Sequence, residues 1–256
     1  QTLVCEMTAD QKKLYEKVKS KYRNLILDAS TMLDRKARFA ILKGLTELRL
    51  IANHPKIYDK ELDISSGKFD EISERLLEIH ETNHKILVFS QFTRHLEIFR
   101  TYLEGKKIKF SMLTGATTNR QEAVESFTKD DNCNVFLISL KAGGVGLTLT
   151  AANNVIHLER WWNPAVEDQC TDRAYRIGQT KTVSVYTPIA KNGSFGEKSF
   201  DCILDRLLNE KRSIAKGLFV PTSVTGDEFG GAFKEGVRGR ELSLEEIDCF
   251  ERGEEF

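Results

Sequence analysis

The sequence predicts an α/β fold in which helices flank a parallel β-sheet. From about residue 85, short continuous apolar runs alternate with amphipathic segments of helical period. Strands that are apolar at every position are typical of parallel sheets, because helices cover both of their faces. Ligands bind such sheets at the carboxyl ends of the strands, so the residues that follow each strand are the candidates for chemistry.

The first sixty residues predict a helical extension. Apolar side chains recur every three to four positions within 14–25 and again within 41–48, which indicates at least two helices. Pro55 ends the second of these, because proline cannot continue a helix. Residues 65–67, Ser-Ser-Gly, predict a linker before a helix with apolar positions between 69 and 79.

Strands and helices alternate in the predicted sheet domain. The strands are expected at 85–90, 108–113, 134–140, 153–159 and 182–186, with helices at 96–103, around 123–127 and from Pro164. A helix at 200–214, a Gly-rich connection at 225–239 and a short acidic helix from Ser243 are expected to follow. The predicted boundaries are 1–65, 66–192, 193–219 and 220–256.

The composition excludes membrane-spanning, collagen-like and wholly disordered chains. Of the 256 residues, 40% are hydrophobic and 30% charged, and no apolar run reaches the roughly 18 residues that a spanning helix needs. The N-terminus shows no secretory signal. Because the chain starts with Gln1 rather than Met, we expect a piece of a longer protein. Five cysteines without a CxxC pair predict reduced thiols and no metal site.

Charge is unevenly distributed along the chain. Residues 227–256 hold ten acids and four bases. Subtracting these from the 38 acids and 38 bases of the whole leaves 28 acids and 34 bases in residues 1–226, a net charge of +6. The net charge of zero therefore combines a basic segment, residues 1–226, with an acidic C-terminal segment. The basic segment suits an anionic partner, and the acidic segment could compete with phosphates for the basic surface.

A glycine-rich loop follows the strand expected at 134–140. Residues 141–146 read Lys-Ala-Gly-Gly-Val-Gly. Three glycines allow backbone N–H groups to approach a phosphate or a sugar closely, at the edge of the sheet where ligands bind. A turn that only packs tightly is an equally good interpretation of this loop taken alone.

Residues 163–178 predict a helix, with Asn-Pro at its start and Gly at its end. On it, Gln169, Arg173 and Arg176 fall at i, i+4 and i+7, so that an amide and two guanidinium groups share one face. Two neighbouring arginines repel each other unless an anion joins them, which favours a phosphate site. A surface ion-pair network that includes Asp172 is the alternative interpretation.

Residues 140–179 closely resemble the second RecA-like lobe of the SWI/SNF-type ATPases, within helicase superfamily 2. The resemblance rests on Lys-Ala-Gly-Gly-Val-Gly-Leu, Trp-Trp-Asn-Pro and Asp-Arg-Ala-Tyr-Arg-Ile-Gly-Gln in this stretch. It implies that a helical protrusion joins an absent N-terminal lobe to this one, and that a brace-like helix and a flexible acidic tail follow. Further matches lie at 48–55 before the lobe, 66–68 at its entry, 85–91 in motif IV and 241–243 near the end.

The resemblance also implies roles for individual residues. Arg173 and Arg176 match the motif VI arginines, which reach the γ-phosphate of ATP held by the other lobe, and Gln169 lies in the same motif. Gly144 and Gly146 match motif V, which lines the nucleotide cleft and couples it to DNA. The residues expected to contact the DNA backbone, without reading its sequence, are Ser90, Gln91, Thr114, Gly115, Ser139 and Lys141.

Some positions depart from the family pattern. Thr148 stands where the family commonly has Asn, and 193–197 read Gly-Ser-Phe-Gly-Glu in place of Gly-Thr-Ile-Glu-Glu. The phosphate-binding motif G-x-x-x-x-G-K-[ST] is absent, since residues 62–69 lack its first Gly and its Ser or Thr. Asp-Glu at 70–71 follows no apolar strand, so it predicts a helix start rather than a magnesium site.

The sequence therefore predicts the C-terminal lobe of a DNA-stimulated ATPase that moves along duplex DNA. ATP and Mg²⁺ would be bound mainly by the other lobe, so the fragment alone is predicted to be inactive. Its expected partners are double-stranded DNA and the N-terminal lobe of the same polypeptide, and no membrane. The fragment is expected to be a monomer inside the cell, in the cytoplasm or nucleoid of a bacterium or in a eukaryotic nucleus.

Two alternatives stand beside this prediction. The first is a stand-alone, non-catalytic RecA-like module that binds nucleic acid or protein. The second is an RNA-directed helicase of the same superfamily, which residues 172–179 disfavour because they match the duplex-DNA branch.

Overall fold

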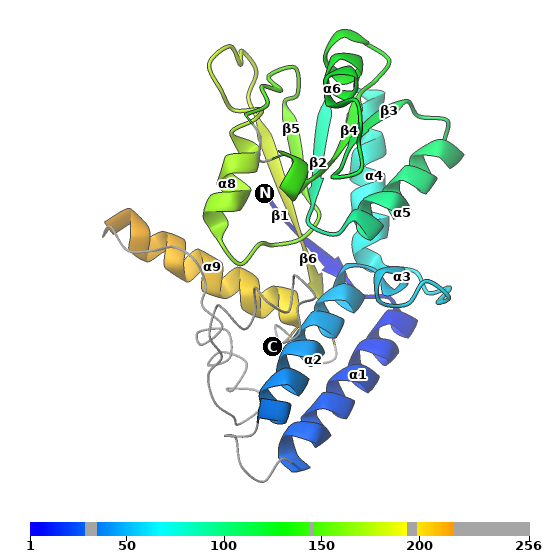
Figure 1. The fold of residues 1–256 in the computed structure, drawn as a ribbon, viewed down its shortest axis with the longest axis vertical. Coiled ribbons are helices and arrows are strands. Elements are labelled where there is room, and N and C mark those ends of the chain that lie inside the picture. The colour runs from blue at the N-terminus through cyan, green and yellow to red at the C-terminus, as the bar shows by residue number, and fades with distance from the viewer. Residues whose placement is uncertain (29–34, 144–145, 194–198, 218–256) are drawn as a thin grey trace. The chain divides into compact units, whose positions relative to one another are not determined.

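A six-stranded β-sheet organises the fold (Figure 1). The structure is a computed structural model that describes residues 1–28, 35–143, 146–193 and 199–217. The predicted Gly-rich connection at 225–239 and the helix from Ser243 lie outside the described residues. The strand order is β1-β6-β5-β2-β4-β3. The strands are β1 (Thr2–Glu6), β2 (Ile86–Ser90), β3 (Phe110–Leu113), β4 (Val135–Ser139), β5 (Asn154–His157) and β6 (Ser184–Lys191).

The strands run parallel, and helices connect them, which confirms the predicted α/β fold. The second helix ends before Pro55, and the helix predicted after the Ser-Ser-Gly linker, α4 (Gly67–Glu81), starts at the last residue of that linker. The helices are α1 (Ala9–Asp28), α2 (Arg35–Asn53), α3 (Pro55–Tyr58), α4 (Gly67–Glu81), α5 (Thr93–Gly105), α6 (Arg120–Lys129), α7 (Leu140–Gly143), α8 (Pro164–Thr171) and α9 (Phe200–Gly217).

The central strands are buried on both faces, as their continuous apolar sequences predict. Every residue of β2, β4 and β5 is buried. Alternate side chains enter two separate clusters, because successive residues of a strand point to opposite faces. Val88 and Leu137 pack with α4 and α5, whereas Phe89 and Ile138 pack with α6, α7 and α8.

The sequence analysis missed strand β1, as well as the four-residue helices α3 and α7, the second of which begins the predicted glycine-rich loop. Strand β1 lies at the edge of the sheet beside β6. The N–H of Thr187 donates to the Gln1 carbonyl at 2.9 Å. Val4 is 60% exposed while Cys5 is buried, so this strand lacks the continuous apolar run by which the central strands were recognised.

The chain folds into two compact units that interleave along the sequence. The sheet unit comprises residues 1–5, 69–161 and 165–189. The helical unit comprises residues 6–68, 162–164 and the chain from 190 onward. The domain boundaries derived from the sequence stay a prediction.

The helical unit has its own core. Helices α1 and α2 pack along each other through Val18, Leu48 and Ile51, and α9 adds Phe200 and Leu204 against α2. Tyr15 is fully buried there, and its hydroxyl accepts a hydrogen bond from the Phe200 N–H at 2.9 Å. Burial raises the pKa of this phenol well above its usual value, so it stays a neutral acceptor.

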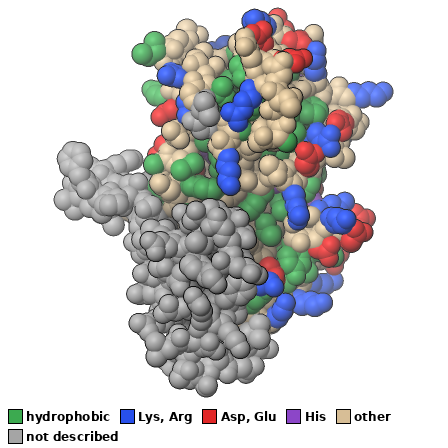
Figure 2. Space-filling model, viewed as in Figure 1, with side chains coloured by type: hydrophobic (Ala, Val, Ile, Leu, Met, Phe, Trp, Pro, Cys, Tyr) green, Lys and Arg blue, Asp and Glu red, His purple; other side chains and the backbone are tan. Residues whose placement is uncertain are grey.

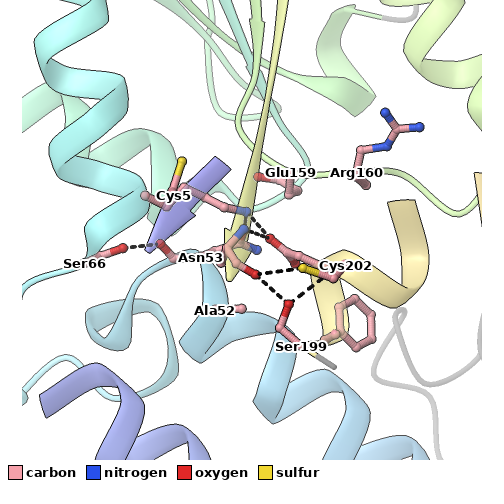
Figure 3. Close-up of polar contacts among 12 residues, drawn as sticks. Cys5, Ala52, Asn53, Ser66, Glu159, Arg160, Ser199 and Cys202 are labelled. Carbon is pink, nitrogen blue, oxygen red and sulfur yellow. Dashed lines mark hydrogen bonds and ion pairs between the residues drawn. The ribbon is translucent and has the colours of Figure 1, made fainter. Parts of the chain in front are cut away.

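A polar cluster joins three segments of the helical unit. The Lys68 ammonium is fully buried, donates to Asn53 Oδ1 at 2.8 Å and pairs with the Asp201 carboxylate. Figure 3 shows neighbouring bonds of this cluster, from the Ser66 hydroxyl to the Asn53 carbonyl and from the Cys202 N–H to the Ser199 hydroxyl. Because each buried charge has a partner, the cluster fixes the ends of α2, α4 and α9 within this unit.

Gly67 allows the chain to enter α4. A Cβ atom at this position would lie 1.7 Å from the Glu6 carbonyl oxygen, which no side chain tolerates. The Asp-Glu pair at 70–71 falls in the first turns of α4, as predicted from the absence of a preceding strand.

Candidate functional site

The residues predicted to contact DNA follow three neighbouring strands. Ser90 ends β2 and pairs in register with Ser139, which ends β4. Thr114 follows Leu113, whose register partner is Ile138, one residue before Ser139. The parallel sheet therefore brings these strand ends to one edge. We call this edge the strand-end rim, and its members are Ser90, Gln91, Thr114, Gly115, Ser139 and Lys141.

The members of the rim differ in exposure. Lys141 and Gly115 are exposed, and Gln91 and Thr114 are half-buried. The hydroxyls of Ser90 and Ser139 belong to residues that are 1% and 4% exposed. Direct contact with a phosphate backbone is thus open to the first four, while the two serines point into the sheet unit.

Glu159 organises the β2 end of the rim, and the sequence analysis did not single it out. Its buried carboxylate accepts from the Ser90 hydroxyl at 2.9 Å, from the Gln91 N–H and from His95 Nδ1 at 3.3 Å. The available signal was an acidic residue directly after an apolar strand, at the edge where the β2 and β5 ends meet. A carboxylate with several donors in a buried site fixes their positions.

Helix α8 is shorter than the sequence predicts. It begins at Pro164, as predicted, but ends at Thr171 rather than near Gly178. The prediction that Gln169 and both arginines share one helical face is therefore wrong, because only Gln169 lies on α8. The arginines lie in the segment that follows, residues 172–179, which we call the arginine turn.

The helix does not reach Gly178, because other groups take the carbonyls that a continued helix would need. An α-helix that continued would need the carbonyls of Arg173 and Ala174 for N–H groups four residues later. The Arg173 carbonyl instead accepts from the Leu149 N–H at 2.8 Å, and the Ala174 carbonyl from the Gln179 amide at 3.1 Å. These partners come from a loop distant in sequence and from a side chain, so helical periodicity alone could not reveal them.

The two arginines nevertheless face one pocket. It has a volume of about 750 Å³ and opens on the sheet unit. Two guanidinium groups against one carboxylate leave an excess positive charge, which suits an anion. The pocket is lined by Gln169, Asp172, Arg173, Tyr175, Arg176, Ile177 and Gln179.

The glycine-rich loop lies partly outside the described residues. Gly144 falls in the undescribed pair 144–145, so its predicted role in nucleotide binding stays a prediction. Gly146 is exposed and has a φ of +35°, a conformation that favours glycine. Two residues further on, the Thr148 hydroxyl accepts a hydrogen bond from Arg176 Nη1 at 3.1 Å.

Cys170 lies on α8 beside the arginine turn. Its thiol is buried in the cluster that contains Ala174, and burial raises the pKa of this thiol to about 12, although the charge of Arg173 partly opposes the shift. The thiol is therefore protonated at neutral pH and serves as an apolar contact. In the part of the chain that the structure describes, Cys5, Cys133 and Cys202 also form no disulfide.

The described residues contain neither a metal-ligand cluster nor a spanning helix. No group of three or more His, Cys, Asp and Glu side chains among them is placed to hold a metal ion. None of the helices within the described ranges is both long and apolar enough to cross a bilayer. Figure 2 shows basic side chains interspersed with acidic and uncharged ones on the visible described surface.

Comparison with known proteins identifies the domain. Residues 67–178 match the family of the helicase conserved C-terminal domain. The putative ATP-dependent helicase/translocase YwqA of Bacillus subtilis (strain 168) is 38% identical over 217 residues, 81% of this chain and 22% of that protein. The lymphoid-specific helicase of Homo sapiens is 38% identical over 160 residues, 57% of this chain and 19% of that protein. The chain thus spans about a fifth of the length of these relatives.

Solved structures agree with the sequence matches. The C-terminal domain of the Sulfolobus solfataricus SWI2/SNF2 ATPase superposes with a TM-score of 0.67 and 29% identity, over 96% of this chain and 95% of that one. The core of the same enzyme in complex with double-stranded DNA gives 0.72 and 29%, over 95% and 50%. These likenesses establish that the chain belongs to the SWI/SNF-type ATPases of helicase superfamily 2, as their C-terminal RecA-like lobe.

Proposed function

We propose that this chain is the C-terminal half of an ATP-driven motor that moves along duplex DNA. The observation that carries the proposal is the pocket that Gln169, Arg173 and Arg176 line together, within a lobe of the SWI/SNF type. The two guanidinium groups would stabilise the charge on a phosphoryl group in transfer, with ATP bound on the other lobe.

The donor set of the pocket fits the triphosphate but not its magnesium ion. Guanidinium and amide N–H groups donate to phosphate oxygens, and Arg176 has further N–H groups beyond the one that Thr148 accepts. Among the described residues, Asp172 is the one carboxylate that lines the pocket. We therefore assign Mg²⁺ to carboxylate and hydroxyl groups of the other lobe, where it would neutralise phosphate charge.

Exposed apolar side chains support a second lobe as the partner that covers the pocket. Ile177 is 100% exposed and Tyr175 69% exposed, and both line the same pocket as the arginines. Large apolar side chains beside a charged pocket mark a surface that another body covers. The N-terminal lobe of the same polypeptide would bury them as it brings ATP to the arginines.

The strand-end rim is the proposed DNA surface. Lys141 supplies a positive charge there, and Gln91, Thr114 and the Gly115 backbone supply groups that reach phosphates. Contacts of this kind fix the protein on the duplex without reading base sequence. The solved relative that contains double-stranded DNA supports this assignment.

The proposal is tested by joining the chain to its N-terminal lobe and measuring DNA-stimulated ATP hydrolysis. Arg176→Ala should lower kcat by about 10³-fold or more while the affinity for ATP is largely kept, because the arginine acts on charge that develops in the transition state. Arg100→Ala is the matched control, since Arg100 is an exposed arginine paired with Glu97 on α5. It should hydrolyse ATP like the parent.

Two results would overturn the motor assignment. The first is a joined protein that hydrolyses no ATP with or without DNA, which would favour the stand-alone binding module. The second is an Arg176→Ala variant as fast as the parent, which would remove this arginine from the reaction.

A further inference from the structure

Hydrogen bonds hold the arginine turn against the loop at residues 148–152, and we call this set of bonds the clasp. The Leu149 N–H donates to the Arg173 carbonyl at 2.8 Å. Arg176 Nη1 donates to the Thr148 hydroxyl at 3.1 Å. These bonds join the turn to the segment that follows the glycine-rich loop, so the position of the arginines depends on that segment.

Gln179 supplies the remaining bonds of the clasp. Its amide nitrogen lies 3.1 Å from the Thr150 carbonyl, 2.8 Å from the Ala152 carbonyl and 3.1 Å from the Ala174 carbonyl. An amide NH₂ has two hydrogens, so three acceptors use its full donor capacity. Its oxygen accepts from the Lys181 N–H at 2.9 Å, which fixes the orientation of the amide.

The loop at 148–152 is a rigid base for this clasp. Leu149 and Ala152 are fully buried, and they pack in one cluster with Ala174 and Cys170. Close packing of these side chains leaves the loop backbone little freedom. The hydrogen-bond acceptors that Gln179 meets therefore lie at fixed positions.

Thr148 holds Arg176 by its side chain rather than by its backbone. Both residues are exposed, so the bond restrains a guanidinium group that solvent would otherwise leave free to change rotamer. The bond occupies one N–H of the five that arginine carries. The others stay available to phosphate oxygens in the pocket.

We propose that Gln179 and Thr148 are positioning residues for Arg173 and Arg176. Gln179 fixes the backbone of the arginine turn against the 148–152 loop, and Thr148 orients the Arg176 guanidinium toward the pocket. The inference rests on the proposed motor function, because it assigns to these side chains a share in the orientation that phosphoryl transfer requires.

A double-mutant cycle in the joined protein tests the role of Thr148. Thr148→Val keeps the shape but removes the hydroxyl, and should lower kcat about fivefold with KM for ATP within about twofold, as expected for an interaction that serves the transition state. Thr148→Ser restores the hydroxyl and should restore the rate. In an Arg176→Ala background, followed by single-turnover hydrolysis, Thr148→Val should have no further effect, because its partner is already gone.

Gln179→Met removes the donors and the acceptor of the amide at similar size. It should lower kcat about tenfold or more, again with a smaller change in KM for ATP. Thr101→Val, at an exposed threonine of α5, is the control and should match the parent. The melting temperature of every variant is measured, since a purely structural role lowers both melting temperature and rate in any background.

A second measurement tests the hydrogen bond between Thr148 and Arg176 without ATP hydrolysis. In the ¹⁵N-labelled chain, the Nη groups of Arg176 should show restricted rotation by NMR, and Thr148→Val should release it. Two results with an active parent would overturn the inference and leave the motor function standing. In the first, Thr148→Val has the same kcat as the parent. In the second, the effect of Thr148→Val adds to that of Arg176→Ala. An inactive parent would overturn the motor function. In that case, free rotation of the Arg176 guanidinium group in the parent would overturn the inference as well.

Discussion

The strand-end rim and the arginine turn are positioned in different ways. At the rim, strand register sets Ser90 opposite Ser139, and the buried Glu159 holds the β2 end. In the arginine turn no regular element holds Arg173 or Arg176, and hydrogen bonds from the 148–152 loop and from Gln179 fix the backbone instead. The rim thus depends on the sheet, and the turn depends on a few specific side chains.

This difference separates stability from activity. At the β2 end of the rim, Ser90 and Glu159 are buried and bonded to each other, so the loss of either leaves donors or acceptors without partners inside the sheet unit. The arginine pocket is open and Arg176 is exposed, so a change there should alter the reaction and leave the free energy of unfolding almost unchanged.

The largest expected effect on stability belongs to Glu159→Ala. The substitution removes the carboxylate that accepts hydrogen bonds from the Ser90 hydroxyl, the Gln91 N–H and His95 at a buried site. We expect the free energy of unfolding to fall by about 3 to 5 kcal/mol, the range typical of removing one member of a buried charged network. Urea denaturation of the chain, followed by circular dichroism, measures it.

Arg176→Ala is the matched control for that measurement in the same chain. It should change the free energy of unfolding by no more than about 0.5 kcal/mol, as exposed substitutions usually do. If Glu159→Ala is as stable as the parent while Arg176→Ala unfolds readily, the assignment of stability to the rim and activity to the turn is reversed.

A smaller effect separates the two serines that pair in register. Ser90 bonds Glu159 and the Phe92 carbonyl, so Ser90→Ala should lower the free energy of unfolding by about 1 to 3 kcal/mol. The Ser139 hydroxyl is buried with no hydrogen-bond partner among the described residues. Ser139→Ala should therefore be neutral or slightly stabilising, because it removes a buried polar group that gains nothing in return.

The same denaturation curves decide the outcome for the serine pair. Equal losses from both substitutions would show that the Ser139 hydroxyl has a partner as strong as Glu159. Equal affinity of both variants and the parent for duplex DNA would further show that neither hydroxyl touches the phosphate backbone, which matches the burial of both side chains.

Continuous apolar runs made most of the sheet predictable. The runs that become β2 and β4 leave few alternatives, since a strand with four successive apolar residues needs cover on both faces. Strand β1 was missed because its exposed Val4 alternates with buried Cys5 at the sheet edge, a pattern too short to stand out over five residues.

The site was harder to predict, because its geometry depends on contacts between distant segments. Helical periodicity extended α8 to Gly178, but the helix ends at Thr171. The Leu149 N–H and the Gln179 amide bond the carbonyls that a helix reaching Gly178 would use. The sequence identified the pocket residues through motif resemblance, but for Glu159 at the rim its one signal was an acidic residue at the end of an apolar run. Such partners become visible only when the register of the strands is known.

The smallest expected effect concerns Cys170, which tests how firmly the base of the arginine turn is closed. Cys170 is 2% exposed, and burial raises the pKa of its thiol to about 12. A raised pKa favours the neutral thiol, so at pH 8 the reactive thiolate should be about a thousandfold scarcer than for a cysteine of ordinary pKa. Alkylation by iodoacetamide should therefore be slow, and its rate should rise about tenfold per pH unit up to pH 10 without a plateau.

The urea-unfolded chain is the control, in which Cys170 should react at the rate of an ordinary thiol. Peptide mapping by mass spectrometry assigns the modified cysteine. A plateau near pH 9 in the folded chain would mean that α8 opens often enough to expose the thiol to water. The arginine turn would then rest on a mobile base, and the clasp of Gln179 and Thr148 would have to supply the order that packing around Cys170 and Ala174 provides here.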